Sequence, residues 1–127
     1  MTISKVSEKY NLTQDTIRYY EKIGLLPKIP RTKSGVRDFD EEACKWVEFI
    51  KCMRNAGMSI ESLIEYVSLF KKGNETLEAR KNLLLEQKLS LLKKQEEINN
   101  TIKRLDYKIK IYDEIMQGKR KNFFEEP

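Results

Sequence analysis

A seven-residue repeat of apolar residues in the C-terminal half restricts the fold more than any other feature of this sequence. One apolar residue stands at every seventh position over six repeats: Leu77, Leu84, Leu91, Ile98, Leu105 and Tyr112. Ile102, Ile109 and Met116 fill the companion positions four residues later, but only in the C-terminal half. Lys81, Lys88 and Gln95 occupy those positions in the N-terminal half, where Leu85, Leu89 and Leu92 widen the seam. The pattern predicts a single helix over about 75–117, roughly 65 Å long.

A helix of this length needs a partner for its apolar seam. It is too long to bury the seam on the small head that precedes it, and six consecutive heptads favour pairing with a second copy. Pairing with a different protein is the alternative. The residues expected to hold a dimeric coiled coil are Leu77, Leu84, Leu91, Ile98, Ile102, Leu105, Ile109 and Tyr112.

The first 24 residues predict two short helices joined by a tight turn. Ser4 is expected to cap a helix over 5–10, which Asn11 ends in a left-handed turn. Thr13 is expected to cap a second helix over 14–22, which Gly24 ends. This arrangement is typical of a helix-turn-helix.

The next segment reads as a basic hairpin. Residues 29–32 and 36–39 are expected to pair as a small β-ribbon around Ser34–Gly35, which is the position of a wing.

Two further helices are expected over 41–56 and 60–72, capped by Asp40 and Ser59, and Asn74 is expected to cap the last helix. The inward face of the first of them is expected to carry Ala43, Trp46, Val47, Phe49, Ile50 and Met53. The chain is therefore predicted to be mostly α. It comprises a winged helix-turn-helix domain with support helices (1–73), a coiled-coil helix (74–117) and a flexible tail (118–127).

Charge distribution points to a nucleic-acid partner. The net charge of +5 divides into +5 over residues 1–37, −4 over 38–70 and +4 over 71–127. A basic head on an acidic support is the electrostatic footprint of a DNA-binding protein.

The residues that enzymes and metal sites need are scarce here. The sequence has no His, no glycine-rich phosphate loop and no nucleophile elbow, so we expect neither an enzyme nor a metal or cofactor. It also lacks a signal-peptide pattern and a membrane-spanning stretch, which predicts a cytoplasmic protein with no membrane partner.

The second helix of a helix-turn-helix enters the major groove, and a wing contacts the DNA backbone. Arg18 is the candidate for a bidentate contact with guanine, and Tyr20 for a hydroxyl contact with phosphate. The full candidate set for DNA is Gln14, Thr16, Arg18, Tyr19, Tyr20, Arg31, Lys33 and Arg37.

These residues lie in two runs that resemble the MerR family of transcription regulators. The runs are TISKVSEKYNLTQDTIRYYEKIGLLP and RTKSGVRDFDEEACKWVEFIKCMRNAGMSIESL, which together cover about residues 2–70. The resemblance implies an antiparallel coiled-coil dimer that binds promoter DNA, bends and untwists it, and so lets RNA polymerase engage both promoter elements. It also implies base-edge contact by Arg18 and backbone contact by Tyr20, Arg31 and Arg37. The sequence departs from the family wing, usually YR-x-Y, by placing Val36 and Phe39 where aromatic hydroxyls stand.

The signal sensed by such a regulator is open to two interpretations. Metal-sensing members carry Cys near the end of the coiled coil, and drug-sensing members carry a large C-terminal domain; this sequence shows neither feature. A thiol is one candidate, and a small-molecule pocket between the head and the coiled coil is the other.

The thiol candidate is Cys52. With Trp46 taken as the centre of the buried helix face, Cys52 falls at the edge of the core and Cys44 farther out. Lys51 and Arg54 are neighbouring cations of the kind that favour a thiolate. The residues alone favour Cys52 as a small apolar filler. Resemblance to an aldehyde- and electrophile-responsive subgroup, with a lone Cys at the matching position, favours a sensor in a stress response.

Two other functional classes share features with this sequence. One is a coiled-coil interaction scaffold that binds no DNA, which the basic wing and Arg18 argue against. The other is a thiol enzyme such as a peroxidase, which would lack a base and a resolving cysteine.

Overall fold

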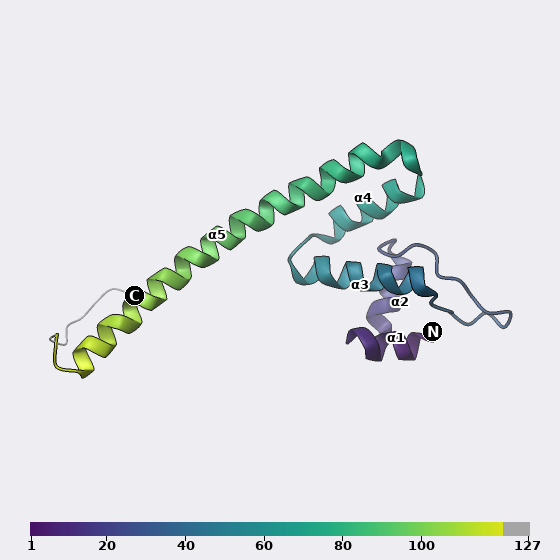
Figure 1. Ribbon diagram of the computed structural model, residues 1–127. Helices are drawn as coiled ribbons and strands as arrows, with labels where there is room; N and C mark the ends of the chain where they lie inside the picture. The colour runs from purple at the N-terminus through teal and green to yellow at the C-terminus, as the bar shows by residue number, and fades with distance from the viewer. Residues whose placement is uncertain (121–127) are drawn as a thin grey trace. The chain divides into compact units, whose positions relative to one another are not determined.

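The described part of the chain is mostly helical, as the sequence predicts (Figure 1). A computed structural model describes residues 1–120. The helices are α1 (Ile3–Tyr10), α2 (Gln14–Lys22), α3 (Glu41–Asn55), α4 (Ile60–Lys71), a short 3₁₀ turn η1 (Asn74–Thr76) and α5 (Leu77–Met116). Contacts within the chain define two compact units, one ending at Gln87 and one starting at Lys88. Residues 121–127, most of the predicted tail, lie outside the described residues.

Short polar side chains determine where most helices begin. The side chains of Thr13, Asp40 and Ser59 accept hydrogen bonds from the backbone N–H groups of Thr16, Ala43 and Ser62. These three caps confirm the sequence-based predictions. Asn11 ends α1 in the left-handed conformation (φ 53°), also as predicted.

Two predicted caps were wrong. Thr2, not Ser4, caps the first helix, because Thr2 is extended and its hydroxyl accepts from the N–H of Lys5 at 3.2 Å. Ser4 therefore lies inside the first turn. Asn74 does not cap α5, since Gly73 stands at that end without a side-chain cap and Asn74 begins the 3₁₀ turn.

Thr76 and Arg80 stabilise the corner between α4 and α5. The Thr76 hydroxyl donates to the carbonyl oxygens of Leu69 (2.6 Å) and Gly73 (2.8 Å). Arg80 donates to Thr76 Oγ1 and to the Gly73 carbonyl, and its guanidinium lies over the Phe70 ring, 5.4 Å from the ring centroid. These bonds give further donors to two carbonyl groups of the corner, that of Leu69 in the last turn of α4 and that of Gly73 after it.

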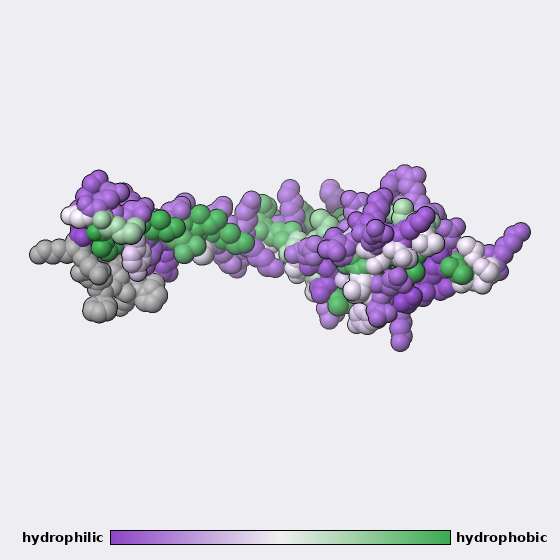
Figure 2. All heavy atoms as spheres, turned by 90° about the horizontal axis from the view of Figure 1, so that it is seen from below, coloured by the Kyte–Doolittle hydropathy of each residue, from purple (hydrophilic) through white to green (hydrophobic). Residues whose placement is uncertain are grey.

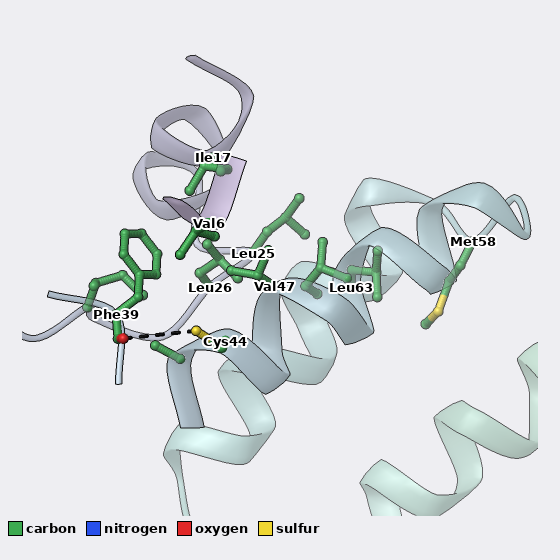
Figure 3. Packing of buried hydrophobic residues seen from close by; sticks show 12 residues of the cluster. Val6, Ile17, Leu25, Leu26, Phe39, Cys44, Val47, Met58 and Leu63 are labelled. Carbon is green, nitrogen blue, oxygen red and sulfur yellow. Dashed lines mark hydrogen bonds between the residues drawn. The ribbon is translucent and has the colours of Figure 1, made fainter. Parts of the chain in front are cut away.

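The core of the head gathers residues from every element between α1 and α4 (Figure 3). Val6 of α1, Ile17 of α2 and Leu63 of α4 meet Val47 and Ile50 of α3. The segment after α2 adds a second group of fully buried side chains, namely Leu25, Leu26, Ile29 and Phe39. The loop that leads into the wing is thus anchored in the core at both ends.

The buried face of α3 differs from the predicted one. Ala43, Val47 and Ile50 are buried as expected, but Trp46, Phe49 and Met53 are only half-buried. The centre of the buried face is therefore Val47 and not Trp46. At about 100° per residue, Cys44 lies about 60° from Val47 and Cys52 about 140° from it.

This shift reverses the predicted positions of the two cysteines. Cys44 is buried (9% exposed), with its Sγ 3.9 Å from the carbonyl oxygen of Phe39, as Figure 3 shows. Cys52 is exposed. The prediction that Cys52 sits at the edge of the core and Cys44 outside it was wrong, because the large Trp46 side chain was taken to mark the core.

Candidate DNA-binding interface

Helix α2 presents a polar outer face opposite its buried residue Ile17. Arg18 donates to Asp15 Oδ1 at 3.1 Å and to Gln14 Oε1 at 3.2 Å, so the three side chains form one network on the surface. Thr16 is linked to the Thr13 cap by hydroxyl and backbone bonds. Gln14 and Arg18 are therefore brought together on α2, while Thr16 lies on a different side of the helix, beside its cap.

The two tyrosines of α2 have different environments. Tyr19 is about half exposed, while Tyr20 is half-buried and packs against the core of the head. The ring centroids of Tyr19 and Tyr20 are 6.5 Å apart. The backbone carbonyl of Tyr20 also accepts hydrogen bonds from the N–H groups of Leu25 and Leu26. These bonds stabilise the turn that follows α2.

The wing is a turn and not a full β-ribbon. Its pairing is reduced to one antiparallel bridge between Arg31 and Arg37. The N–H of Thr32 donates to the Val36 carbonyl at 2.8 Å, and the N–H of Asp38 donates to the Pro30 carbonyl at 2.8 Å. The described residues thus hold no extended strand pair, since the segment is short and Pro30 has no N–H to donate.

The departure from the family wing has a structural consequence. Phe39 is buried in the core and anchors the wing, so it does not face solvent. Val36 is 55% exposed near the wing turn. Neither residue therefore gives the wing surface an aromatic hydroxyl, and the cationic side chains of the wing are Arg31, Lys33 and Arg37.

Glu21 connects the wing to α2, and sequence reasoning missed it. Its Oε1 accepts from Arg37 Nε at 2.8 Å and lies 3.8 Å from an Nη of Arg31. Its Oε2 accepts from the N–H of Ile29 at 3.2 Å. One signal was available: Glu21 is four residues after the buried Ile17, so the two share a helix face, where a carboxylate needs partners.

The predicted coiled-coil residues form an apolar strip along α5, visible in Figure 2. Leu84 is half-buried. The others are exposed in the single chain: Leu77, Leu91, Ile98, Ile102, Leu105, Ile109 and Tyr112. Ile111, which is not in the heptad set, is buried.

The cations beside Cys52 have other partners. Lys51 Nζ donates to the carbonyl of Tyr10, and Arg54 donates to the carbonyl of Met58 at 2.9 Å. Lys51 therefore joins α3 to α1, and Arg54 joins α3 to the loop before α4. Cys52 is an exposed thiol on α3.

A second apolar cluster lies on the outer side of α3 and α4. Trp46 makes edge-to-face contacts with Phe49 and Phe70, and its ring centroid is 6.1 Å from that of Tyr66. With Glu42 and Lys45 these rings line an open hollow of about 270 Å³.

The described part of the chain has neither a cluster of metal-binding side chains nor a membrane-spanning helix. Within residues 1–120 no three His, Cys, Asp or Glu side chains gather closely enough to hold a metal ion. The same residues include no helix with the length and apolar content to span a membrane.

Comparison with known proteins identifies the family. Residues 1–69 match the family described as MerR HTH family regulatory protein. The chain belongs to the MerR family. The match covers the head of the fold: α1, the helix α2 that carries IRYYE, the wing, α3 and nearly all of α4.

Several MerR relatives are transcription regulators. The chain is 58% identical to the HTH-type transcriptional regulator AdhR of Bacillus subtilis over 92 residues, which are 72% of this chain and just under two thirds (66%) of that protein. It is 30% identical to an HTH-type regulator of Haemophilus influenzae over 87% of this chain and 82% of the relative. The prediction that the chain is a regulator and not an enzyme agrees with these relatives.

Solved structures of MerR regulators share the fold. A regulator from Listeria monocytogenes superposes with a TM-score of 0.86 at 48% identity, covering 89% of this chain and 86% of that one. HiNmlR, described as a MerR family regulator lacking the sensor domain and bound to promoter DNA, gives a TM-score of 0.83 at 28% identity, covering 91% and 92%. The predicted fold class, a helix-turn-helix head with a long C-terminal helix, is confirmed.

Proposed function

We propose that this MerR protein binds promoter DNA as a homodimer and changes transcription in response to an electrophile. Helix α2 is the recognition helix, with Gln14, Thr16, Arg18 and Tyr19 facing the major groove. Tyr20, Arg31, Lys33 and Arg37 contact the DNA backbone. The observation that carries the proposal is the exposed polar face of α2, flanked by a basic wing whose two arginines bond to α2 itself.

Dimerisation is supported by the exposed seam of α5. A Leu or Ile side chain gains about 1.5–3 kcal/mol when it is fully buried, so seven exposed seam residues favour association strongly. We propose an antiparallel coiled coil, in line with the family resemblance. The two heads would then occupy the two halves of a palindromic site.

Distortion of the DNA is the proposed route to transcription. The bound dimer bends and untwists the promoter so that RNA polymerase engages both promoter elements, and the cost of deformation depends on the sequence deformed. Such a protein acts where promoters are, in the cytoplasm.

The experiment that tests DNA binding is selection from a random duplex library by the full chain, followed by footprinting of the selected sequence. We expect one palindromic site, protected by a dimer. Affinity should fall steeply with salt because phosphate contacts release counterions. Enrichment of no sequence, or equal affinity for random duplex, would contradict the proposal.

Cys52 is the proposed sensor because it is the exposed one of the two thiols. Its thiolate adds to an aldehyde carbonyl carbon, and the carbonyl oxygen takes up a proton to give a hemithioacetal, so no oxidant is needed. Since Cys52 lies outside the core of its own head, the adduct adds no volume there. Its volume instead changes the exposed surface of α3, and in this proposal that change shifts the balance between two orientations of the heads.

A small-molecule site is the second candidate for the sensor. The hollow on α3 and α4 supports it, because aromatic walls with a few polar groups are typical of ligand pockets. A regulator that used this site would respond normally without Cys52.

A further inference from the structure

The Glu21 carboxylate contacts both arginines of the wing, Arg31 and Arg37. Within residues 1–120 it is the only acidic group that does so. Its side chain is 16% exposed, and that of Arg37 is 24% exposed. It receives one backbone donor, from Ile29, and one guanidinium donor at 2.8 Å, from Arg37. A carboxylate so far removed from water needs such donors, and charge-assisted bonds of this length are the stronger kind.

Arg31 is held from two sides. One of its Nη atoms donates to the Gly35 carbonyl at 3.0 Å, at the wing turn, and the other lies 3.8 Å from Glu21 Oε1. Arg37 uses its Nε for Glu21, which leaves the Nη edge of the guanidinium available to another acceptor. Both arginines are thus restrained without losing their capacity to bind phosphate.

We propose that Glu21 is a positioning residue that joins the wing to the recognition helix, so that α2 and the wing arginines meet DNA as one preorganised surface. This inference rests on the proposed DNA binding. Neither the family match nor the candidate DNA-contact residues assign a role to Glu21, which touches no DNA in this proposal and acts through Arg31 and Arg37.

Two effects of opposite sign follow from this geometry. Restraining two long arginine side chains before binding reduces the entropy lost on an operator, so Glu21 tightens specific binding. Its negative charge also offsets part of the positive charge of the wing, so Glu21 weakens the sequence-independent attraction to phosphates. Glu21 therefore raises the ratio of specific to non-specific affinity.

The test uses Glu21→Gln, which keeps the size of the side chain and an acceptor for the Ile29 N–H. The probes are the duplex selected by the wild-type chain and a random duplex of the same length. We expect operator affinity to fall by about 5- to 100-fold, the loss expected for two arginine side chains ordered only on binding. Affinity for the random duplex should stay the same or rise. Glu48→Gln is the matched control, since it removes the same charge from an exposed position on α3 and should change both affinities equally.

A double-variant cycle separates positioning from a general effect on stability. In an Arg37→Gln background, Glu21→Gln should cost less than in the wild type, by more than about twofold, because contacting residues couple. In the free protein, the Arg37 Nε–H resonance should be slow to exchange and should lose this protection in Glu21→Gln. If Glu21→Gln fails to fold by circular dichroism, Glu21→Asp, which keeps the charge but shortens its reach, should show the same loss to a smaller degree.

Failure of the positioning role and failure of DNA binding would give different experimental results. Unchanged operator affinity in a folded Glu21→Gln (or in Glu21→Asp, if that variant has to be used), or costs that simply add in the cycle, would overturn the positioning role. Failure of the wild-type chain to select any sequence would overturn DNA binding instead, while the exchange of the Arg37 Nε–H would still test the contact.

Discussion

Arg18 lies on the exposed face of α2 with its guanidinium already bonded to Asp15 and Gln14. Both partners of the Arg18–Asp15 ion pair are exposed, and such pairs contribute about 0–1 kcal/mol. Exchanging Asp15 for a guanine edge would therefore cost little. Until then, the network holds the guanidinium on the face that we propose enters the major groove.

Arg18→Ala should weaken operator binding by about 1–3 kcal/mol and relax preference at one base pair of each half-site. Competition binding with single-base operator variants measures both effects. Lys45→Ala is a suitable control, because it removes a charge from a similar exposed ion pair on α3. Operator affinity that Arg18→Ala leaves intact would mean that another face of the head enters the groove.

The two cysteines differ in exposure. We therefore expect the exposed Cys52 to act as the sensor and the buried Cys44 to fill space in the core. Cys52→Ser should keep operator binding and lose the response of a promoter reporter to an aldehyde, because the exposed nucleophile is gone. Cys44→Ser should keep the response, since its thiol is buried against Phe39. A Cys52→Ser strain with normal induction would direct the search to the aromatic hollow on α3 and α4.

At the scale of elements, α3 links the wing to the core. Asp40 lies directly after Phe39, the wing's anchor in the core, and its side chain accepts from the Ala43 N–H at 2.8 Å. The same cap therefore starts α3 and ends the wing.

Asp40→Ala should lower the free energy of unfolding by about 0.5–2 kcal/mol, the usual loss for an N-cap. Urea denaturation at fixed protein concentration measures it, since a dimer's stability depends on concentration. Asp40→Asn should retain most of the stability because its side-chain oxygen caps equally well. Equal losses in both variants would show that the charge of Asp40 matters more than its cap.

At the scale of the whole molecule, a 40-residue helix with an exposed apolar strip indicates assembly. Leu91→Asp should give monomers in analytical ultracentrifugation, because it places a charge without a partner at the seam. Ser90→Asp introduces the same residue at the next position, off the seam, and should remain a dimer. Dimers of Leu91→Asp at micromolar concentration would remove α5 as the main interface.

Local interactions made the elements predictable from sequence. The caps Thr13, Asp40 and Ser59 and the left-handed Asn11 act within four residues of themselves, so their neighbours in the chain suffice to define them. The heptad register of α5 is local in the same sense. That Gln14 and Arg18 share one face follows from their spacing of four residues, although their role in DNA binding stays a prediction.

Contacts between elements distant in the sequence decided which side chains are buried and which charges pair. The buried face of α3 depends on where α1, α2 and α4 cover it, and its own sequence is apolar over a wider arc than they fill. Trp46 therefore lies at the rim, Cys44 is buried and Cys52 is exposed. The environments of Phe39 and Glu21 could likewise not be predicted, because their partners are distant in the sequence. Phe39 enters a core built by four helices, and Glu21 accepts a hydrogen bond from Arg37, sixteen residues away. By itself the sequence determined the helices, most of their ends and the apolar strip of α5. Only the tertiary structure decided which side chains are buried and which charges pair, since both depend on contacts that no local pattern encodes.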